Sequence, residues 1–144
     1  MLLTATCIVQ EGCVPDHQRP ELEATLKDAV RTHVGDDARL AVAWLTIPRG
    51  SGYAAGRPST SSLVQVAVPD GFDQAAREAL MHDLNDRWCR LTGQSPFELL
   101  IGATDKTPGR VVIKSLAQQI PLRNKPRFFI DYASQAIGSL ARSR

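Results

Sequence analysis

The side chains best suited to chemistry lie in separate segments of this sequence. His33 ends a stretch with helical periodicity, and an imidazole at a helix C-terminus holds its proton more readily, which suits a general acid or an anion ligand. Arg39 opens an apolar stretch, and Arg57 lies in a Gly-Arg-Pro turn. Each guanidinium could bind a carboxylate through two parallel hydrogen bonds. Tyr53 lies among glycines and could point into the pocket of a neighbouring subunit. The alternatives are a helix-end cap, two solvated arginines and a tyrosine that packs at an interface.

Cysteine and glycine spacing predicts neither a metal site nor a nucleotide cofactor. Cys7, Cys13 and Cys89 form no CxxC pair and no metal spacing with histidine, so we expect them to be small packed hydrophobes without a disulfide or zinc. The glycines within 50–56 lead into Pro58, whereas a phosphate loop leads into a helix N-terminus. We therefore expect no metal and no cofactor.

Composition excludes several classes of protein. The 144 residues suffice for one domain with a full core. The chain is 43% hydrophobic and 22% charged with a mean hydropathy of −0.17, and no apolar run approaches the roughly 18 residues of a membrane-spanning helix. The net charge of +2 and pI of about 8.6 fall short of the pI above about 9 that is typical of nucleic-acid-binding domains. The first residues lack the features of a signal peptide, so we expect a cytoplasmic protein that binds neither nucleic acid nor a membrane.

Hydrophobic periodicity predicts two strand-helix-strand units separated by a glycine-rich hairpin. Apolar residues at alternate positions indicate strands, and apolar residues three to four positions apart indicate helices. Pro20 is placed to open the first helix, and Gly93 is placed to cap the second. The expected elements are strand 2–9, helix 20–34, strand 40–47, hairpin 49–62, strand 63–68, helix 72–92, strand 97–101, a short strand at 111–113 and helix 128–140.

These elements predict one α+β (α/β-like) domain over residues 1–144. Units 1–48 and 63–108 flank the hairpin 49–62, and a C-terminal extension follows from residue 109 to residue 144. Two crossover units give a four-stranded mixed sheet with two helices on one face, plus a C-terminal helix. Because the other face is then bare, we expect a cyclic oligomer in which the C-terminal helix or the hairpin reaches a neighbour.

The order of elements and several residue runs resemble the tautomerase superfamily, in particular the branch that contains cis-3-chloroacrylic acid dehalogenase. The runs are Leu63-Val64-Gln65-Val66, Leu80-Met81-His82-Asp83-Leu84, Thr92-Gly93 and Pro96-Phe97-Glu98-Leu99-Leu100-Ile101. The resemblance covers roughly residues 2–114. It implies a tautomerase/MIF-like fold, a trimer or hexamer, and a site at the start of the first strand, where the family uses an amino-terminal proline as a general base or acid.

This sequence departs from that family at the catalytic positions. The second residue is Leu2, and a bulky second residue normally leaves Met1 in place, so the proline is missing. The two substrate-binding arginines, the tyrosine and the water-activating glutamate of the dehalogenase branch fall at Asp70, Asp73, Ala103 and near Lys114. The resemblance therefore does not imply dehalogenation by the family's mechanism.

The resemblance makes the α-amino group of Met1 the candidate base, or the amine of a Schiff base with a carbonyl substrate. Leu2 adjoins it and would contact the substrate or fill the pocket. Arg39 lies near the place of a cationic residue in some tautomerases, and His33 lies close to a histidine of the dehalogenase branch. We expect a tautomerase-like isomerase, or a lyase, that acts on a small carbonyl or enol such as a keto acid within a homotrimer. The alternative is a non-catalytic subunit of a hetero-oligomer or a protein that binds a small ligand.

Overall fold

The computed structural model describes residues 1–108 and 125–142. Its elements are β1 (Leu2–Gln10), the short 3-10 helix η1 (Asp16–Gln18), α1 (Arg19–Val34), β2 (Arg39–Ile47), β3 (Tyr53–Ala54), β4 (Arg57–Pro58), β5 (Ser62–Val68), α2 (Gln74–Thr92), the 3-10 helix η2 (Pro96–Glu98), β6 (Leu99–Asp105) and α4 (Lys125–Ala141). The short strand expected at 111–113 lies outside the described residues.

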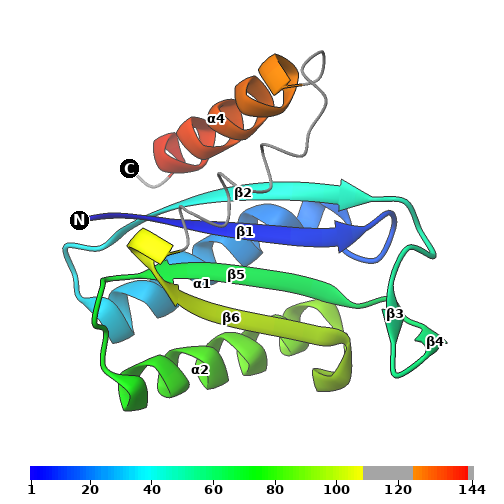
Figure 1. The fold of residues 1–144 in the computed structure, drawn as a ribbon, viewed down its shortest axis with the longest axis horizontal. Helices are drawn as coiled ribbons and strands as arrows, with labels where there is room; N and C mark the ends of the chain where they lie inside the picture. The colour runs from blue at the N-terminus through cyan, green and yellow to red at the C-terminus, as the bar shows by residue number, and fades with distance from the viewer. Residues whose placement is uncertain (109–124, 143–144) are drawn as a thin grey trace.

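The main sheet has the order β2-β1-β5-β6. The outer pairs β1/β2 and β5/β6 are parallel, and the central pair β1/β5 is antiparallel, so the sheet is mixed as expected. In the sequence, the short strands β3 and β4 lie between β2 and β5, and they form a separate two-stranded hairpin. Figure 1 shows both α1 and α2 behind the sheet and the hairpin beyond one of its ends. The predicted architecture of two strand-helix-strand units is therefore confirmed.

One face of the sheet and one stripe of each helix make the core. Along β1 every second side chain is buried, which is the period of a strand with a single covered face. Leu22, Leu26 and Val30 of α1 and Leu80 and Leu84 of α2 are fully buried against that face. The three-to-four spacing of these residues is the helical signal that was visible in the sequence.

Local hydrogen bonds fix where two elements begin, and both differ from the expectation. The second helix begins at Gln74 instead of residue 72, because the Asp73 carboxylate accepts from the Ala76 N–H at 2.9 Å and caps the helix. The fourth strand begins at Leu99 instead of Phe97. Ser95 and Glu98 form a reciprocal capping box that turns 96–98 into η2 and leaves Phe97 94% exposed.

The C-terminal helix α4 packs on β2, the edge strand of the sheet (Figure 1). The Val42 N–H donates to Ser139 Oγ at 3.1 Å, and the Trp44 N–H donates to Gln135 Oε1 at 2.6 Å. Side chains of α4 thus take the place of a neighbouring strand for these two amides. Of the two arms expected to reach a neighbour, α4 lies instead on its own chain.

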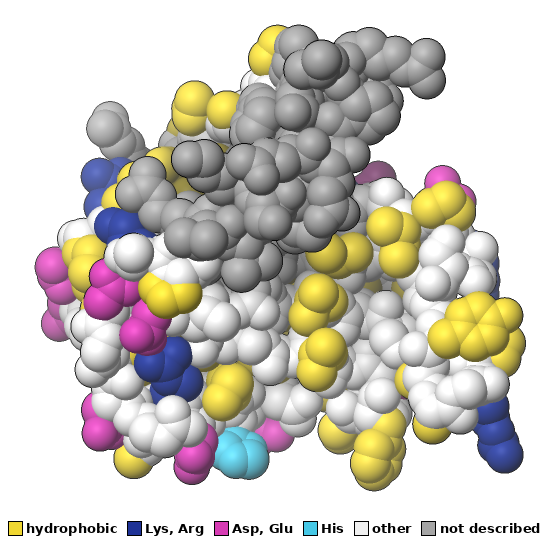
Figure 2. All heavy atoms as spheres, in the orientation of Figure 1, with side chains coloured by type: hydrophobic (Ala, Val, Ile, Leu, Met, Phe, Trp, Pro, Cys, Tyr) yellow, Lys and Arg dark blue, Asp and Glu magenta, His cyan; other side chains and the backbone are white. Residues whose placement is uncertain are grey.

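The sheet face opposite α1 and α2 mixes apolar and polar side chains. Leu2 and Leu100 are 49% and 65% exposed there, and Gln65 donates to Thr104 Oγ1 at 2.9 Å across β5 and β6. Figure 2 shows hydrophobic side chains scattered over this face among polar ones. Helices α1 and α2 leave this face uncovered, as expected from the topology.

Candidate functional site

The start of β1 brings together three of the residues singled out by the sequence. The Met1 α-amino group donates to the Asp37 carbonyl oxygen at 2.7 Å and lies 3.3 Å from the Asp37 carboxylate. The Arg39 N–H donates to the Met1 carbonyl oxygen at 2.8 Å, and Leu2 pairs with Arg39 in the parallel register. Met1, Leu2 and Arg39 are therefore neighbours because β1 and β2 begin side by side.

A small cavity of about 220 Å³ opens at the same end of β1. Leu2, Leu3, Thr4 and Lys106 line it. Lys106 directly follows β6, the strand at the opposite edge of the sheet from β2, and it lines this cavity together with the first residues of β1. Lys106 was not among the site residues predicted from the sequence. The position directly after a strand, at the end of the sheet where the first strand begins, is the signal that would have identified it.

The guanidinium of Arg39 makes no hydrogen bond or ion pair with any residue that the structure describes. Cations from two different strands thus flank the exposed Leu2 side chain, Arg39 from β2 and Lys106 from the end of β6. A pair of cations beside an amine can hold a carboxylate and can stabilise negative charge that develops on a carbonyl oxygen.

His33 contacts α2 instead of the β1 site. Its Nε2 atom lies 3.1 Å from Asp83 Oδ2, and Arg87 Nε donates to Asp83 Oδ1 at 2.7 Å. Burial alone would raise the pKa of Asp83, but the hydrogen bonds from Arg87 and His33 outweigh it and lower that pKa. The structure therefore places His33 in an ion-pair cluster between the two helices, apart from Met1 and Arg39.

Tyr53 and Arg57 lie on the β3-β4 hairpin, at the opposite end of the sheet from Met1 (Figure 1). The nine residues of β1 span roughly 26 Å at about 3.3 Å per residue, so these side chains cannot meet Met1 within one chain. The buried Gln10 anchors the hairpin, because its amide donates to Ser59 O at 2.7 Å and accepts from the Gly50 N–H at 3.0 Å.

The two aspartates at the family's arginine positions serve the fold. Asp73 caps α2, and Asp70 accepts from the Thr107 N–H at 2.9 Å and from its hydroxyl at 2.6 Å. Hydrogen bonds from Thr107 lower the pKa of Asp70. Of the other two positions, Ala103 is buried in β6 and Lys114 lies outside the described residues. No described residue at these positions can replace the missing arginines.

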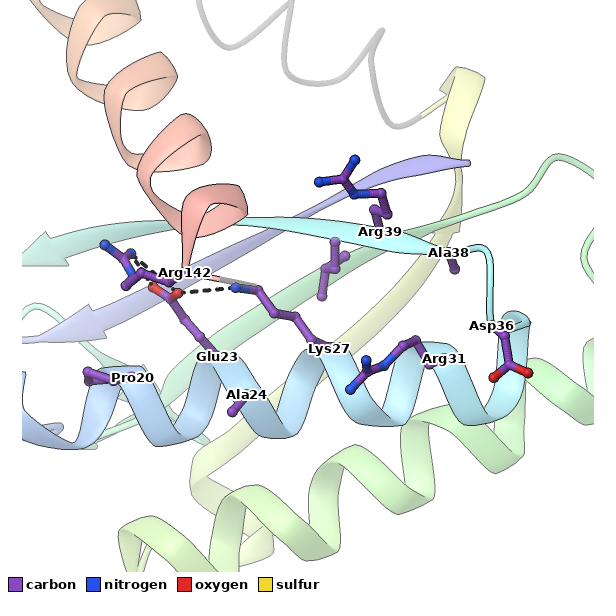
Figure 3. A pocket seen from close by; sticks show the side chains of 10 residues that line it. Pro20, Glu23, Ala24, Lys27, Arg31, Asp36, Ala38, Arg39 and Arg142 are labelled. Carbon is purple, nitrogen blue, oxygen red and sulfur yellow. Dashed lines mark hydrogen bonds and ion pairs between the residues drawn. The ribbon is translucent and has the colours of Figure 1, made fainter. Parts of the chain in front are cut away.

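A second and larger cavity, of about 550 Å³, lies beside the edge of β2 (Figure 3). Its lining includes four cations, Lys27, Arg31, Arg39 and Arg142, and two carboxylates, Glu23 and Asp36. Glu23, Lys27 and Arg31 follow one another at intervals of four residues on one face of α1, a charge pattern that is visible in the sequence.

The remaining reactive groups support neither a thiolate nor a metal site among residues 1–108 and 125–142. Burial raises the pKa of the Cys7 thiol, with the nearby Glu23 charge adding to the effect. The described residues contain no group of three or more His, Cys, Asp or Glu side chains that could hold a metal ion. Within the same residues, no helix has the length and apolar character needed to cross a membrane.

The sequence matches no family model and no curated protein, whereas the fold matches solved structures of the tautomerase superfamily. N1, a member of the cis-3-chloroacrylic acid dehalogenase family, aligns with a TM-score of 0.64 at 10% identity over 86% of this chain and 96% of that chain. A symmetric trimer of fused 4-OT aligns with a TM-score of 0.62 at 19% identity over 71% and 84%. Pt0534 inactivated by 2-oxo-3-pentynoate aligns with a TM-score of 0.61 at 24% identity over 71% and 84%. At these identities the likeness establishes the fold, and the expected tautomerase-like fold is confirmed.

Proposed function

We propose that this protein catalyses proton transfer on a small 2-oxo acid or its enol, with the α-amino group of Met1 as the base. The observation that carries the proposal is the position of this amine at the start of β1, next to Arg39 and beside the cavity that Lys106 lines. In its neutral form an α-amino group carries a lone pair that can accept a proton, as a general base requires.

The proposed reaction is an isomerisation without loss or gain of atoms. The amine removes a proton from the carbon next to the carbonyl. The electron pair of that C–H bond forms a C=C bond, and the π pair of the carbonyl moves onto its oxygen to give the enolate. Arg39 and Lys106 bind the carboxylate of the substrate and stabilise the enolate charge. The ammonium then returns the proton to the enolate oxygen. Asp37 is a positioning residue here, because its carbonyl and carboxylate oxygens fix the amine.

Two of the structurally similar proteins support this choice of substrate and a homotrimeric assembly. Pt0534 is inactivated by a 2-oxo acid, 2-oxo-3-pentynoate, and one fused 4-OT structure is a symmetric trimer. In a cyclic trimer of the present chain, the hairpin of one subunit would bring Tyr53 and Arg57 to the β1 start of its neighbour. That arrangement would enlarge a cavity which, at about 220 Å³, is smaller than the roughly 300 Å³ of a typical ligand pocket.

Covalent labelling by 2-oxo-3-pentynoate tests the base directly. The amine nitrogen would add to the alkyne carbon farther from the ketone, a proton would move from the nitrogen to the alkyne carbon next to the ketone, and no atom would leave. We expect the intact mass to rise by one whole reagent, with peptide mapping placing the adduct on Met1. Labelling confined to Cys13 or Cys89 would contradict the proposal.

Turnover is tested with the enol of a 2-oxo acid, whose absorbance disappears as the ketone forms. A short peptide extension before Met1 should abolish turnover, and the same extension after Arg144 should leave it intact. We expect Lys106→Gln to lower kcat/KM by about tenfold or more, as for loss of one charge-assisted hydrogen bond. Equal turnover in the two extended chains would exclude the amine as the base.

A further inference from the structure

Among residues 1–108 and 125–142, the lining of the larger cavity carries more positive than negative charges. The cations of its lining are Lys27 and Arg31 from α1, Arg39 from β2 and Arg142, which directly follows α4. Figure 3 shows Arg39 directed away from α1, on the other side of β2 from Lys27 and Arg31. Four cations face two carboxylates in the lining. Because like charges repel, such a wall is stable only where solvent or a counter-ion offsets the repulsion.

The charge of Glu23 is already shared among several partners. Its carboxylate, which is 5% exposed, accepts from Trp44 Nε1 at 3.0 Å and from Arg142 at 3.1 Å, and it lies 3.7 Å from the Lys27 ammonium. Figure 3 shows Lys27 and Arg142 both directed toward this carboxylate. Glu23 is thus engaged with two cations and cannot also offset the charges of Arg31 and Arg39.

Arg31 and Arg39 provide the unoccupied donors of the cavity. Arg31 has one long contact, 3.7 Å to Asp28, whose side chain is 53% exposed. Arg39 has no side-chain partner among the described residues. Such a contact between exposed charges contributes little, so both guanidinium groups are free to turn to a better acceptor.

Lys27 shows the same shortage of negative charge. Its side chain is 12% exposed, and it donates to the Ser139 carbonyl oxygen at 2.6 Å. Burial lowers the pKa of Lys27, and Arg142 lowers it further, although Glu23 acts in the opposite direction. An additional anion in the cavity would stabilise the ammonium.

We propose that this cavity binds a compact organic oxyanion with more than one negative charge, held by Arg31 and Lys27, with Arg39 at the margin of the cavity. Its volume of about 550 Å³ fits the range of small-molecule sites and exceeds what a bare ion needs. The shared chemistry is that of carboxylate or phosphate oxygens, which guanidinium groups bind in a two-pronged geometry. The proposal does not rest on the proton-transfer chemistry, although Arg39, which lines this cavity, also has a role in that chemistry.

Isothermal titration calorimetry of the full chain with inorganic phosphate and, separately, with malonate tests the proposal. We expect at least one anion to bind with a dissociation constant of roughly millimolar or below. Tighter binding of phosphate would identify a phosphorylated ligand, and tighter binding of malonate would identify a dicarboxylate. Absence of binding by both at about ten times that concentration would overturn the proposal.

Matched variants locate the bound anion. Arg31→Gln should weaken binding about tenfold or more, whereas Arg90→Gln, which removes an exposed charge of α2, should leave the affinity within about twofold. Lys106→Gln separates the two cavities, because an anion bound at the start of β1 would be lost in this variant and kept in Arg31→Gln. Equal affinities for the Arg31 and Arg90 variants, or a loss confined to the Lys106 variant, would refute the site. Circular dichroism verifies that each variant is folded.

Discussion

The carboxylate of Glu23 contacts residues that lie far from it in the sequence. It is buried, and its carboxylate contacts α1, β2 and α4 through Lys27, Trp44 and Arg142. Glu23→Gln would leave both cations without their anion. We expect the free energy of unfolding to fall by about 2 to 3 kcal/mol, below the roughly 3 to 5 kcal/mol of a fully buried pair because Arg142 is half exposed. Urea denaturation of both proteins measures the difference in the free energy of unfolding.

The matched control for that substitution is Glu21→Gln, in the first turn of the same helix. Glu21 is exposed, and we expect its loss to change the free energy of unfolding by less than about 0.5 kcal/mol. If both variants unfolded at the same urea concentration, Glu23 would not be the link between α1, β2 and α4.

We expect the Asp83 carboxylate to contribute to the loss of folding stability at acid pH. Its pKa is lowered in the folded protein, where hydrogen bonds from Arg87 and His33 outweigh burial. The resulting stability is present above the unfolded pKa, near 3.9, and is lost as the pH falls through the lower folded pKa. Asp83→Asn should therefore unfold more easily at pH 7 and lose less stability between pH 5 and pH 3 than the unchanged protein. Thermal melts at both ends of that range measure the difference.

At the scale of elements, the seam between α4 and β2 replaces strand pairing. Ser139 Oγ and Gln135 Oε1 accept from the Val42 and Trp44 amides. The double variant Ser139→Ala with Gln135→Ala leaves these amides without acceptors. We expect a loss of about 2 to 3 kcal/mol and faster hydrogen exchange at Val42 and Trp44.

Ser134→Ala provides the control for the α4 seam, because Ser134 is exposed on the same helix. In the Ser134→Ala variant, hydrogen exchange of the Val42 and Trp44 amides should equal that of the unchanged protein. Slow exchange of Val42 and Trp44 in the double variant would mean that α4 does not protect this edge. An edge strand that is covered in this way is also protected against pairing with other chains.

At the scale of the whole molecule, the uncovered sheet face predicts self-association. We expect light scattering to report about three times the 15.7 kDa of one chain. Leu100→Arg, on the uncovered face, should shift the protein toward monomer because an arginine there would have to be desolvated at the interface. His82→Arg, on the exposed side of α2, should leave the mass unchanged. A monomeric unchanged protein would contradict the trimer.

The secondary structure was largely predictable because its signals are local. Pro20 near the start of α1, Gly93 in a left-handed conformation after α2 and the partial alternation in β1 act over a few residues each. The two errors at Phe97 and Phe72 have the same cause. Both boundaries were predicted from hydrophobic residues, whereas the hydrogen bonds of the capping residues Ser95 and Asp73 determine where β6 and α2 begin.

The candidate site was only partly predictable, because it depends on how distant segments approach. The sequence by itself determined the helices and strands, the double strand-helix-strand order and the candidates Met1, Leu2 and Arg39, which adjacent strand starts bring together. Only the tertiary structure decided that Lys106 reaches the start of β1 and that His33 pairs with Asp83. It alone also joined Arg142 to Glu23, which lies 119 positions earlier. Periodicity and caps report contacts within a few residues, whereas a binding site depends on the path of the whole chain.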